Sequence, residues 1–291
     1  MNSQLWTVVL AAGEGRRLAG VTGGVPKQFW RDVSGTSLLA QTIQRFTPLT
    51  PRRRTIVIVD AAHEDHVRAS GLSASTGALV VQPQDRGTAA GVLLALTPVL
   101  ESSPDDIVVV TPSDHGVMDG TSFRCGVLAV VSHVRTREDI VLFGVEPTSA
   151  HQDYGWISVG RAHTGALRPV ESFVEKPSAT HAVQLFASGA VWNTMVIVAR
   201  AQAIRDLYVE LLPELAKVFA TALRLPAQER ASFLASVYPT LPWCDFSRDL
   251  MTRARRLSVY VWPASLGWTD LGTPERLREW HRRTAPQTAV A

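Results

Sequence analysis

Five short apolar runs alternate with helix-like segments in the first half of the chain, and this alternation constrains the fold most. The runs are rich in Val and Ile and cover Trp6–Ala11, Thr55–Asp60, Ala78–Gln82, Ile107–Thr111 and Ile140–Val145. Helices between them are expected at Ser37–Phe46, Ala62–Ala69, Thr88–Leu100 and Thr121–Val134. Continuous apolar strands separated by helices predict a doubly wound α/β fold, with a mostly parallel, mixed sheet covered on both faces. Ligands of such sheets lie beyond the carboxyl ends of the strands.

The pattern changes after residue 145. Strands are expected at 154–159, 170–174, 190–199 and 257–262, with helices at 180–187 and from Pro274 onward, and with mainly helical structure over 202–237 interrupted at Pro213 and Pro226. No repeat or low-complexity linker separates the two parts. The sequence therefore predicts a single domain over residues 1–291, in which a second half from about residue 146 packs on the same sheet.

A glycine-rich segment follows the first apolar run directly. Gly13-Glu14-Gly15-Arg16-Arg17 comes first, and a second glycine-rich stretch over residues 20–24 leads to Pro26-Lys27. Backbone N–H groups of such a turn bind phosphate, because glycine permits close approach and positive φ angles. Arg17 and Lys27 then supply positive charge. The alternative is an ordinary strand-to-helix turn with solvated arginines, but the coincidence of glycines and cations favours a phosphate site.

Composition excludes several other classes of function. The net charge is only +3, which is too weak to indicate nucleic acid or an anionic membrane as the partner, whereas a phosphorylated ligand needs only a local basic patch. Cys125 and Cys244 are the two cysteines, so no disulfide framework is implied. The short N-terminal apolar run does not resemble a leader, and no run reaches the length of a membrane span. We expect a cytoplasmic protein.

Eight motifs in order along the chain resemble the sugar-1-phosphate nucleotidyltransferases, most closely the mannose-1-phosphate guanylyltransferases. The motifs are LAAGEGRRL, Pro26-Lys27-Gln28-Phe29, Arg86-Gly87-Thr88-Ala89, Pro112-Ser113-Asp114-His115, Tyr154-Gly155-Trp156-Ile157, Phe173-Val174-Glu175-Lys176-Pro177, Trp192-Asn193-Thr194 and Trp268-Thr269-Asp270-Leu271-Gly272. The resemblance implies a Rossmann-like nucleotide-binding half over residues 1–145 and an inserted sugar- and metal-binding part over 146–291. It also implies that a nucleoside triphosphate and a sugar 1-phosphate are converted to an NDP-sugar and pyrophosphate.

The resemblance assigns catalytic roles to Arg17, Lys27 and Asp114, and a shared Mg²⁺ (or Mn²⁺) to Asp114 and Asp270. Carboxylates suit Mg²⁺, which prefers oxygen ligands and keeps several waters. Taken singly, either aspartate is better explained as a cap or turn residue, but two of them, each just past a strand in a motif of the family, favour the metal role. The same resemblance assigns nucleotide binding to residues of the glycine-rich loop and of two later motifs: Leu10, Ala11, Ala12, Gly13, Glu14, Gly15, Arg16, Gln82, Arg86, Gly87 and Thr88.

The sugar phosphate is assigned by resemblance to Gly155, Glu175, Lys176 and Asn193. Glu175 would accept hydrogen bonds from sugar hydroxyls, and Lys176 would pair with the phosphate. A surface ion pair is the alternative for Glu175 and Lys176, and a structural amide is the alternative for Asn193. Four tryptophans near the C-terminus, at 243, 262, 268 and 280, are most simply core or interface anchors, and Trp268 is also a candidate wall of the site.

Three positions depart from the guanylyltransferase pattern and leave the base open. Gln82 replaces the usual glutamate, Gly87 replaces an asparagine, and Met195 replaces a glycine. A carboxylate suits the two adjacent donors of guanine, whereas a glutamine suits uracil or thymine at least as well. We expect GTP and mannose 1-phosphate as substrates, with a thymidylyl- or uridylyltransferase, or a non-catalytic NDP-sugar-binding regulator, as alternatives. A homodimer is compatible with the sequence.

A Rossmann dinucleotide enzyme and a cytidylyltransferase of the isoprenoid pathway fit less well. Gly13 and Gly15 match half of the dinucleotide fingerprint, but the third small residue is missing, and Asp60 lies too far along the chain to be the expected acidic residue. The cytidylyltransferase resemblance ends after Lys27 and leaves the motifs of the second half unexplained.

Overall fold

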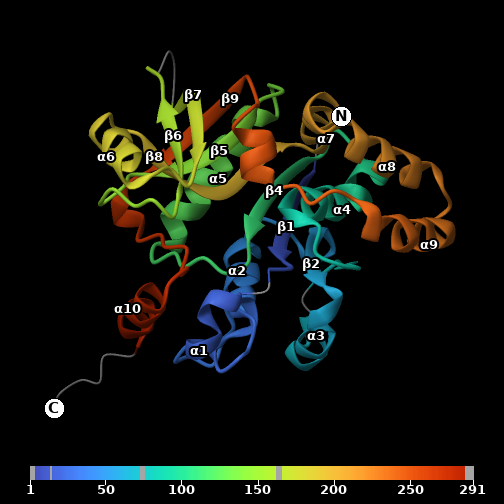
Figure 1. The fold of residues 1–291 in the computed structure, drawn as a ribbon, viewed down its shortest axis with the longest axis horizontal. Helices are drawn as coiled ribbons and strands as arrows, with labels where there is room; N and C mark the ends of the chain where they lie inside the picture. The colour runs from blue at the N-terminus through green and yellow to red at the C-terminus, as the bar shows by residue number, and fades with distance from the viewer. Residues whose placement is uncertain (1–3, 14, 73–75, 162–165, 286–291) are drawn as a thin grey trace.

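One mixed sheet runs through the centre of the computed structural model, which describes residues 4–13, 15–72, 76–161 and 166–285 (Figure 1). Within these residues the sheet has nine strands, in the order β3-β2-β1-β4-β8-β5-β9-β7-β6. The strands are β1 (Leu5–Ala11), β2 (Thr55–Asp60), β3 (Ala78–Gln82), β4 (Ile107–Pro112), β5 (Ile140–Val145), β6 (Gly155–Val159), β7 (Leu167–Glu175), β8 (Val191–Arg200) and β9 (Leu257–Trp262).

The α-helices and the shorter helical turns connect these strands. The α-helices are α1 (Ala19–Thr22), α2 (Leu38–Phe46), α3 (Glu64–Ser70), α4 (Gly87–Ser102), α5 (Gly120–Val134), α6 (Ala179–Ala187), α7 (Ala201–Leu211), α8 (Pro213–Arg224), α9 (Ala227–Val237) and α10 (Pro274–Thr284). The short 3₁₀ turns are η1 (Arg16–Leu18), η2 (Lys27–Phe29), η3 (Arg52–Arg54), η4 (Ala61–His63), η6 (Tyr238–Thr240) and η8 (Ala264–Leu266), and η7 (Phe246–Met251) is a π-helix.

Strands β1 to β4 pair in parallel, as the apolar runs predict. Adjacent side chains of these strands lie in different cores. Val8 and Ile56 belong to the core formed with α4, α7 and α8, whereas the adjacent Val9 and Val57 belong to the core formed with α2 and α3. The strands are apolar throughout because both faces are covered. The doubly wound α/β fold is confirmed, and the carboxyl ends of β1 to β4 meet at one edge of the sheet.

The second half adds antiparallel strands to the same sheet. Every antiparallel pair in the described residues includes β6, β7 or β8. Strand β6 pairs with β7 and also with the start of β8, so the pairings β8–β5–β9–β7–β6 close into a ring. Helices α7, α8 and α9 are separated at Pro213, the first residue of α8, and at Pro226, the N-cap of α9, as predicted.

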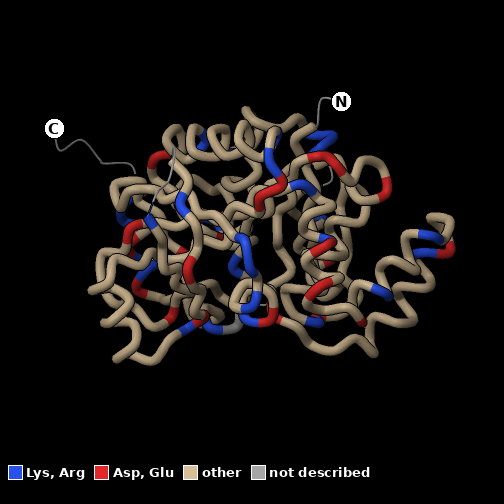
Figure 2. The backbone as a smooth tube through the Cα atoms, turned by 90° about the horizontal axis from the view of Figure 1, so that it is seen from above, with Lys and Arg blue, Asp and Glu red and all other residues tan. Residues whose placement is uncertain are grey.

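Charged residues of both signs are interspersed along the backbone in the view of Figure 2, in agreement with the small net charge. A ligand-binding site of one sign must therefore be local. None of the helices in the described part of the chain combines the length and the apolar character that a membrane crossing needs.

Candidate active site

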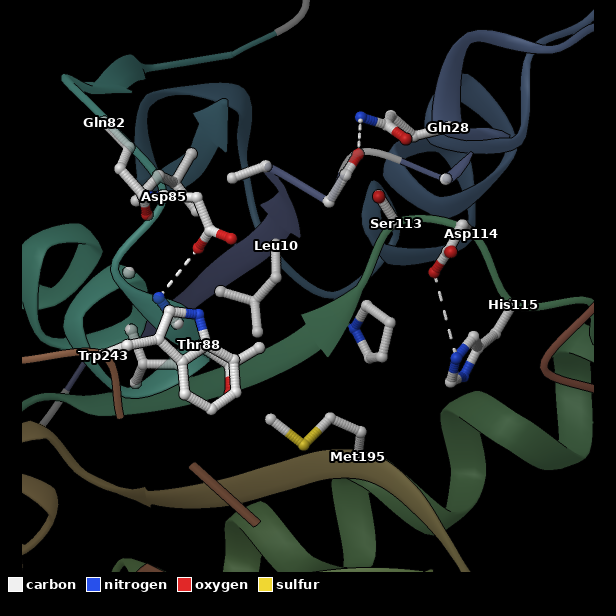
Figure 3. A pocket seen from close by; sticks show the side chains of 18 residues that line it. Leu10, Gln28, Gln82, Asp85, Thr88, Ser113, Asp114, His115, Met195 and Trp243 are labelled. Carbon is white, nitrogen blue, oxygen red and sulfur yellow. Dashed lines mark hydrogen bonds and ion pairs between the residues drawn. The ribbon is translucent and has the colours of Figure 1, made fainter. Parts of the chain in front are cut away.

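A cavity of about 340 Å³ opens at the carboxyl edge of the parallel strands (Figure 3). Its walls come from the loops after β1, β3 and β4, from the start of α4, and from two residues of the second half, Met195 and Trp243. Seven of the predicted nucleotide-binding residues line it: Leu10, Ala12, Gly13, Gly15, Gln82, Gly87 and Thr88. The structure thus gathers most of the predicted nucleotide set where the fold rule places ligands.

The glycine-rich loop is fixed by the segment that follows it. Gly15 has a φ of +65°, and a Cβ there would lie 2.9 Å from the Lys27 backbone nitrogen, so only glycine fits. The buried Gln28 amide donates to the carbonyl oxygens of Ala11 and Gly13, at 2.9 Å each. Gln28 belongs to one of the sequence motifs, but this structural role was not predicted. The shape of the loop is therefore held by contacts within the protein.

Lys27 connects the two predicted metal-binding aspartates. Its ammonium lies 2.9 Å from Asp114 Oδ2 and also donates to the backbone oxygen of Asp270. An antiparallel bridge between Gly116 and Thr269 brings the loop after β4 beside the Asp270 segment, with N···O distances of 2.8 and 3.0 Å. Lys27, Asp114 and Asp270 thus lie together, although they are far apart in the sequence.

The charges around Asp114 favour its ionised form. Burial alone raises the pKa of this carboxyl, but the Lys27 ammonium and His115 outweigh burial and hold the pKa below its usual value. Burial lowers the pKa of His115, whose ring packs edge-on against Trp268, with the ring centroids 5.3 Å apart. Trp268 thus lies beside the site, as the sequence suggested. At neutral pH this corner presents a carboxylate paired with an ammonium.

Asp270 is held through one carboxylate oxygen. Its Oδ1 accepts from Arg276 at 2.6 Å, from the Gly272 N–H at 3.0 Å and from the Tyr154 hydroxyl at 3.2 Å. Burial raises the pKa of Asp270, but His115 and Arg276 outweigh it, and the pKa lies below its usual value. Arg276, at the start of α10, has no counterpart in the predicted set. It was missed because no motif extends past Gly272.

These two carboxylates can take part in a Mg²⁺ site, but they do not complete one. In the described residues no hydrogen bond reaches Asp270 Oδ2, and a Cβ at Gly272 would lie 2.5 Å from that oxygen. Asp114 Oδ1 lies 3.8 Å from His115 Nε2, beyond a hydrogen bond. No group of three or more His, Cys, Asp or Glu side chains in that part of the chain is arranged to hold a metal. Water and substrate phosphate would have to supply the remaining ligands, as Mg²⁺ commonly accepts.

The predicted sugar-binding residues form a second group, outside the cavity. Gly155 pairs with Glu175 across β6 and β7, and a Cβ at Gly155 would lie 2.7 Å from Glu175 Oε2 and 3.3 Å from Asn193 Cβ. Lys176 Nζ lies 3.7 Å from Glu175 Oε1. The group adjoins the cavity through Asp245, whose Oδ2 accepts from Thr88 at 3.3 Å and whose charge acts on Glu175.

Backbone strain is concentrated around these two groups. In the described residues four non-glycine residues have a positive φ: Lys176 at 48°, Leu271 at 50°, Met195 at 58° and Arg256 at 64°. The first three lie in or beside the predicted motifs. Left-handed backbone is unfavourable for residues with a Cβ and is typically retained at functional sites.

Other predicted residues are not gathered into the cavity. Arg17 is exposed on η1 and is not among the described lining residues, and Arg86 donates to the Pro239 carbonyl. Ala11 is buried in β1, behind the loop. Glu14 and the side chain of Arg16 lie outside what the structure describes.

The residues that line the cavity without having been predicted as ligand-binding include Asp85 and Trp243. Asp85 points into it beside Gln82, and its Oδ1 accepts from the Gly87 N–H at 2.8 Å (Figure 3). Trp243, expected as a core or interface anchor, is 52% exposed and lines the cavity, whereas Trp262, Trp268 and Trp280 are buried as expected. The position of Trp243 depends on a tertiary contact with the start of α4, which the sequence does not reveal.

Sequence comparison matches residues 6–287 to the family described as Nucleotidyl transferase. The chain is 28% identical over 284 residues to the Xanthan biosynthesis protein XanB of Xanthomonas campestris pv. campestris (strain B100), covering 93% of this chain and 58% of that protein. It is 28% identical over 286 residues to a mannose-1-phosphate guanylyltransferase of Salmonella muenchen, again covering 93% of this chain and 58% of that protein. The chain thus spans less than two thirds of the length of these relatives.

The fold is similar to that of a crystal structure described as mannose-1-phosphate geranyltransferase from Thermus thermophilus. The TM-score is 0.85 at 28% identity, and the match covers 95% of this chain and 79% of that one. A mannose-6-phosphate isomerase structure from Helicobacter pylori matches with a TM-score of 0.71 at 18% identity, covering 91% of this chain and 99% of that one, which shows similarity of fold alone.

Proposed function

The chain belongs to the nucleotidyl transferase family, and we propose that it transfers a nucleotidyl group from a nucleoside triphosphate to a sugar 1-phosphate, releasing pyrophosphate. One observation carries this proposal. Lys27, which follows the glycine-rich segment, is buried between Asp114 and Asp270 at the edge of the cavity. A cation fixed between carboxylates beside a backbone phosphate loop suits phosphoryl chemistry better than it suits a structural role.

The chemistry needs electrostatic stabilisation more than a strong base. A phosphate monoester is largely ionised at neutral pH, since its second pKa is about 6, so the sugar phosphate is itself the nucleophile. The loop N–H groups orient the triphosphate, and Lys27 neutralises charge at the reacting phosphoryl groups. Asp114 and Asp270 would hold a Mg²⁺, which when bound supplies further positive charge to the phosphates. Arg17, exposed beside the loop, reaches the departing pyrophosphate.

The sugar phosphate binds at the second group of residues. Glu175 accepts from sugar hydroxyls, with Asn193 beside it, and Lys176 pairs with the phosphate. Gly155 matters because any side chain there would collide with Glu175 and Asn193. The Asp245–Thr88 contact supports this arrangement, because Thr88 lines the cavity and the charge of Asp245 acts on the pKa of Glu175.

For the base we propose guanine, and for the sugar mannose. The relative named mannose-1-phosphate guanylyltransferase supports this choice. The carboxylate of Asp85 supports it independently, since it lines the cavity beside Gln82 and is an acceptor suited to the two adjacent donors of guanine. Gln82, buried at 2% exposure, supports the alternative, a thymidylyl- or uridylyltransferase, because an amide suits uracil or thymine at least as well as it suits guanine.

A pyrophosphate-release matrix tests the proposal. GTP, UTP, dTTP, CTP and ATP are crossed with mannose, glucose and N-acetylglucosamine 1-phosphates, and GTP with mannose 1-phosphate should give the highest kcat/KM. Asp85→Asn should lower kcat/KM for GTP about tenfold and leave UTP nearly unchanged, because one hydrogen-bonded charge is lost. Asp65→Asn, on the exposed face of α3, is the control. Binding of NDP-sugar without turnover of any pair would instead indicate a regulatory protein.

A further inference from the structure

Trp243 presents an exposed indole ring at the cavity. All eight tryptophans lie in the described residues, and Trp243 is the exposed one, at 52%. It lines the cavity together with Leu10, Gln82 and Gly87, and Figure 3 shows its ring beside Thr88. Exposed apolar surface is unfavourable in water, so a large aromatic ring at the mouth of a cavity suggests a ligand contact.

The backbone next to this ring is held by hydrogen bonds. The neighbouring Cys244 donates its N–H to the Arg86 carbonyl at 3.1 Å, and its own carbonyl accepts from the Ala89 N–H at 3.0 Å. A Cβ at Gly87 would lie 2.2 Å from that carbonyl oxygen, so glycine is required for the contact. The segment carrying Trp243 is therefore clamped to the start of α4.

A cation also orients the indole. The Arg248 guanidinium lies over the ring, 5.9 Å from its centroid, within the range of a cation–π contact. The Arg248 backbone is itself fixed, because its N–H donates to Asp245 Oδ1 at 2.8 Å. A ring whose neighbouring backbone is held and whose face contacts a cation presents a planar surface with less freedom to lose on binding.

We propose that Trp243 is a stacking platform for the nucleobase of the bound nucleoside triphosphate, an inference that rests on the proposed function. A planar base stacks on an aromatic ring whatever its hydrogen-bonding edge. The base is favoured over the sugar ring because Trp243 shares the cavity with Gln82 and Gly87, whereas Gly155, Glu175 and Asn193 are not among the described residues that line it. Stacking would supply affinity, and Gln82 and Asp85 would supply selectivity.

Calorimetric titration of the full chain with GTP and with inorganic tripolyphosphate, which has no base, tests the inference. Trp243→Ala should weaken GTP binding about tenfold or more, the usual effect of losing one base–aromatic stack. The same variant should bind tripolyphosphate within twofold of wild type. Trp243→Phe, which keeps an aromatic ring, should restore most of the affinity for GTP. In steady-state kinetics, the Trp243→Ala substitution should raise KM for the nucleotide and leave KM for the sugar phosphate unchanged.

Three results would overturn the inference while the proposed function stands, with wild type still releasing pyrophosphate. These are unchanged GTP affinity in Trp243→Ala, equal weakening of GTP and tripolyphosphate, or a raised KM confined to the sugar phosphate. Unchanged GTP affinity together with a loss of self-association in sedimentation would assign the ring to an interface between copies of the chain. Absence of turnover by wild type with every substrate pair would instead reject the proposed function.

Discussion

Lys27 Nζ lies 2.9 Å from Asp114 Oδ2, so the cation that follows the glycine-rich segment is paired with the carboxylate that follows β4. The same ammonium donates to the Asp270 backbone oxygen, and Lys27 is only 6% exposed. Protein groups thus fix its position. A charge held in this way needs little reorganisation when phosphate binds beside it, which is the condition under which electrostatic stabilisation is most effective.

Replacing Lys27 should therefore affect catalysis more than any exposed lysine does. Lys27→Ala is expected to lower kcat/KM at least about 100-fold, the scale of one preorganised electrostatic contact. Lys217→Ala, exposed on α8, is the matched control and should have no effect. Steady-state kinetics measure the change, and circular dichroism checks the fold. A loss of only a few-fold in a folded Lys27→Ala variant would remove Lys27 from the reaction.

Activity should require Mg²⁺ or Mn²⁺ and should be abolished by EDTA. Asp114→Asn and Asp270→Asn are each expected to lower kcat/KM at least about 100-fold by loss of metal charge. Calorimetry should show Mg²⁺ binding that strengthens with nucleotide in wild type and is lost in either variant. Asp153→Asn is the control. The Asp153 side chain also pairs with Arg276, at 3.3 Å, but it is exposed and is not a proposed metal ligand. Full activity in EDTA would exclude the metal site.

Lys176 should act on the sugar phosphate and not on the nucleotide. Its ammonium extends from the end of β7 beside Glu175, outside the cavity lined by the glycine-rich loop. Lys176→Ala is expected to raise KM for sugar 1-phosphate about tenfold, a typical effect of losing a charge-assisted contact, and to leave KM for the triphosphate within about twofold. Initial rates with each substrate varied separately measure the split. The opposite split would reassign Lys176 to the triphosphate.

The ionised Glu175 carboxylate is expected to lower the free energy of unfolding of the protein at neutral pH. Burial raises the pKa of Glu175 above its usual value, with Lys176 opposing in part. For a raised carboxyl pKa, the stability is highest below the unfolded-state value of about 4.3 and falls as the pH rises through the folded-state pKa. Glu175→Gln should therefore unfold at higher urea concentration than wild type at pH 8, and the two should converge near pH 4. Glu171→Gln, exposed on the same strand, is the control, and a constant difference across this pH range would contradict the prediction.

The strands were predictable because their chemistry is local. Strands β2, β3, β5 and β9 begin and end where the predicted strands do. In β2 and β5 every residue is buried, which demands apolar residues nearly throughout. Strand β7 is longer than predicted, from Leu167 to Glu175, because Pro169 and alternating polar residues conceal its start. The π-helix η7 was not predicted, since its six residues are too few to establish a helical apolar period.

The site was predictable only where a motif carries its chemistry. Lys27, Asp114 and Asp270 could be chosen from their motifs, but the Gly116–Thr269 bridge that brings them together cannot be read from the sequence. Asp85 and Trp243 lie outside the motifs. The place of Trp243 in the cavity depends on how the chain returns after α9, which is a tertiary contact without a local signal. Asp85 lies in the loop between β3 and α4, where it accepts from the nearby Gly87 N–H, and no motif marks it.

At Met195 the backbone and the side chain favour different residue types. Its φ of +58° suits glycine, yet the side chain lines the cavity. Met195→Gly and Met195→Ala remove the same atoms beyond Cβ, so a comparison of the two isolates the backbone strain. Glycine should be the more stable by about 1 kcal/mol in urea unfolding, since it avoids the left-handed penalty of a Cβ.

Met118, exposed in the loop before α5 and without a positive φ, provides the matched control. There the order should reverse, because alanine lowers the entropy of the unfolded chain by roughly 0.4–1 kcal/mol relative to glycine wherever the native backbone accepts a Cβ. Opposite signs at the two methionines would establish that the chain retains strain at residue 195 for the sake of the side chain in the cavity. An alanine variant at 195 as stable as the glycine variant would show that the turn accommodates a Cβ without strain.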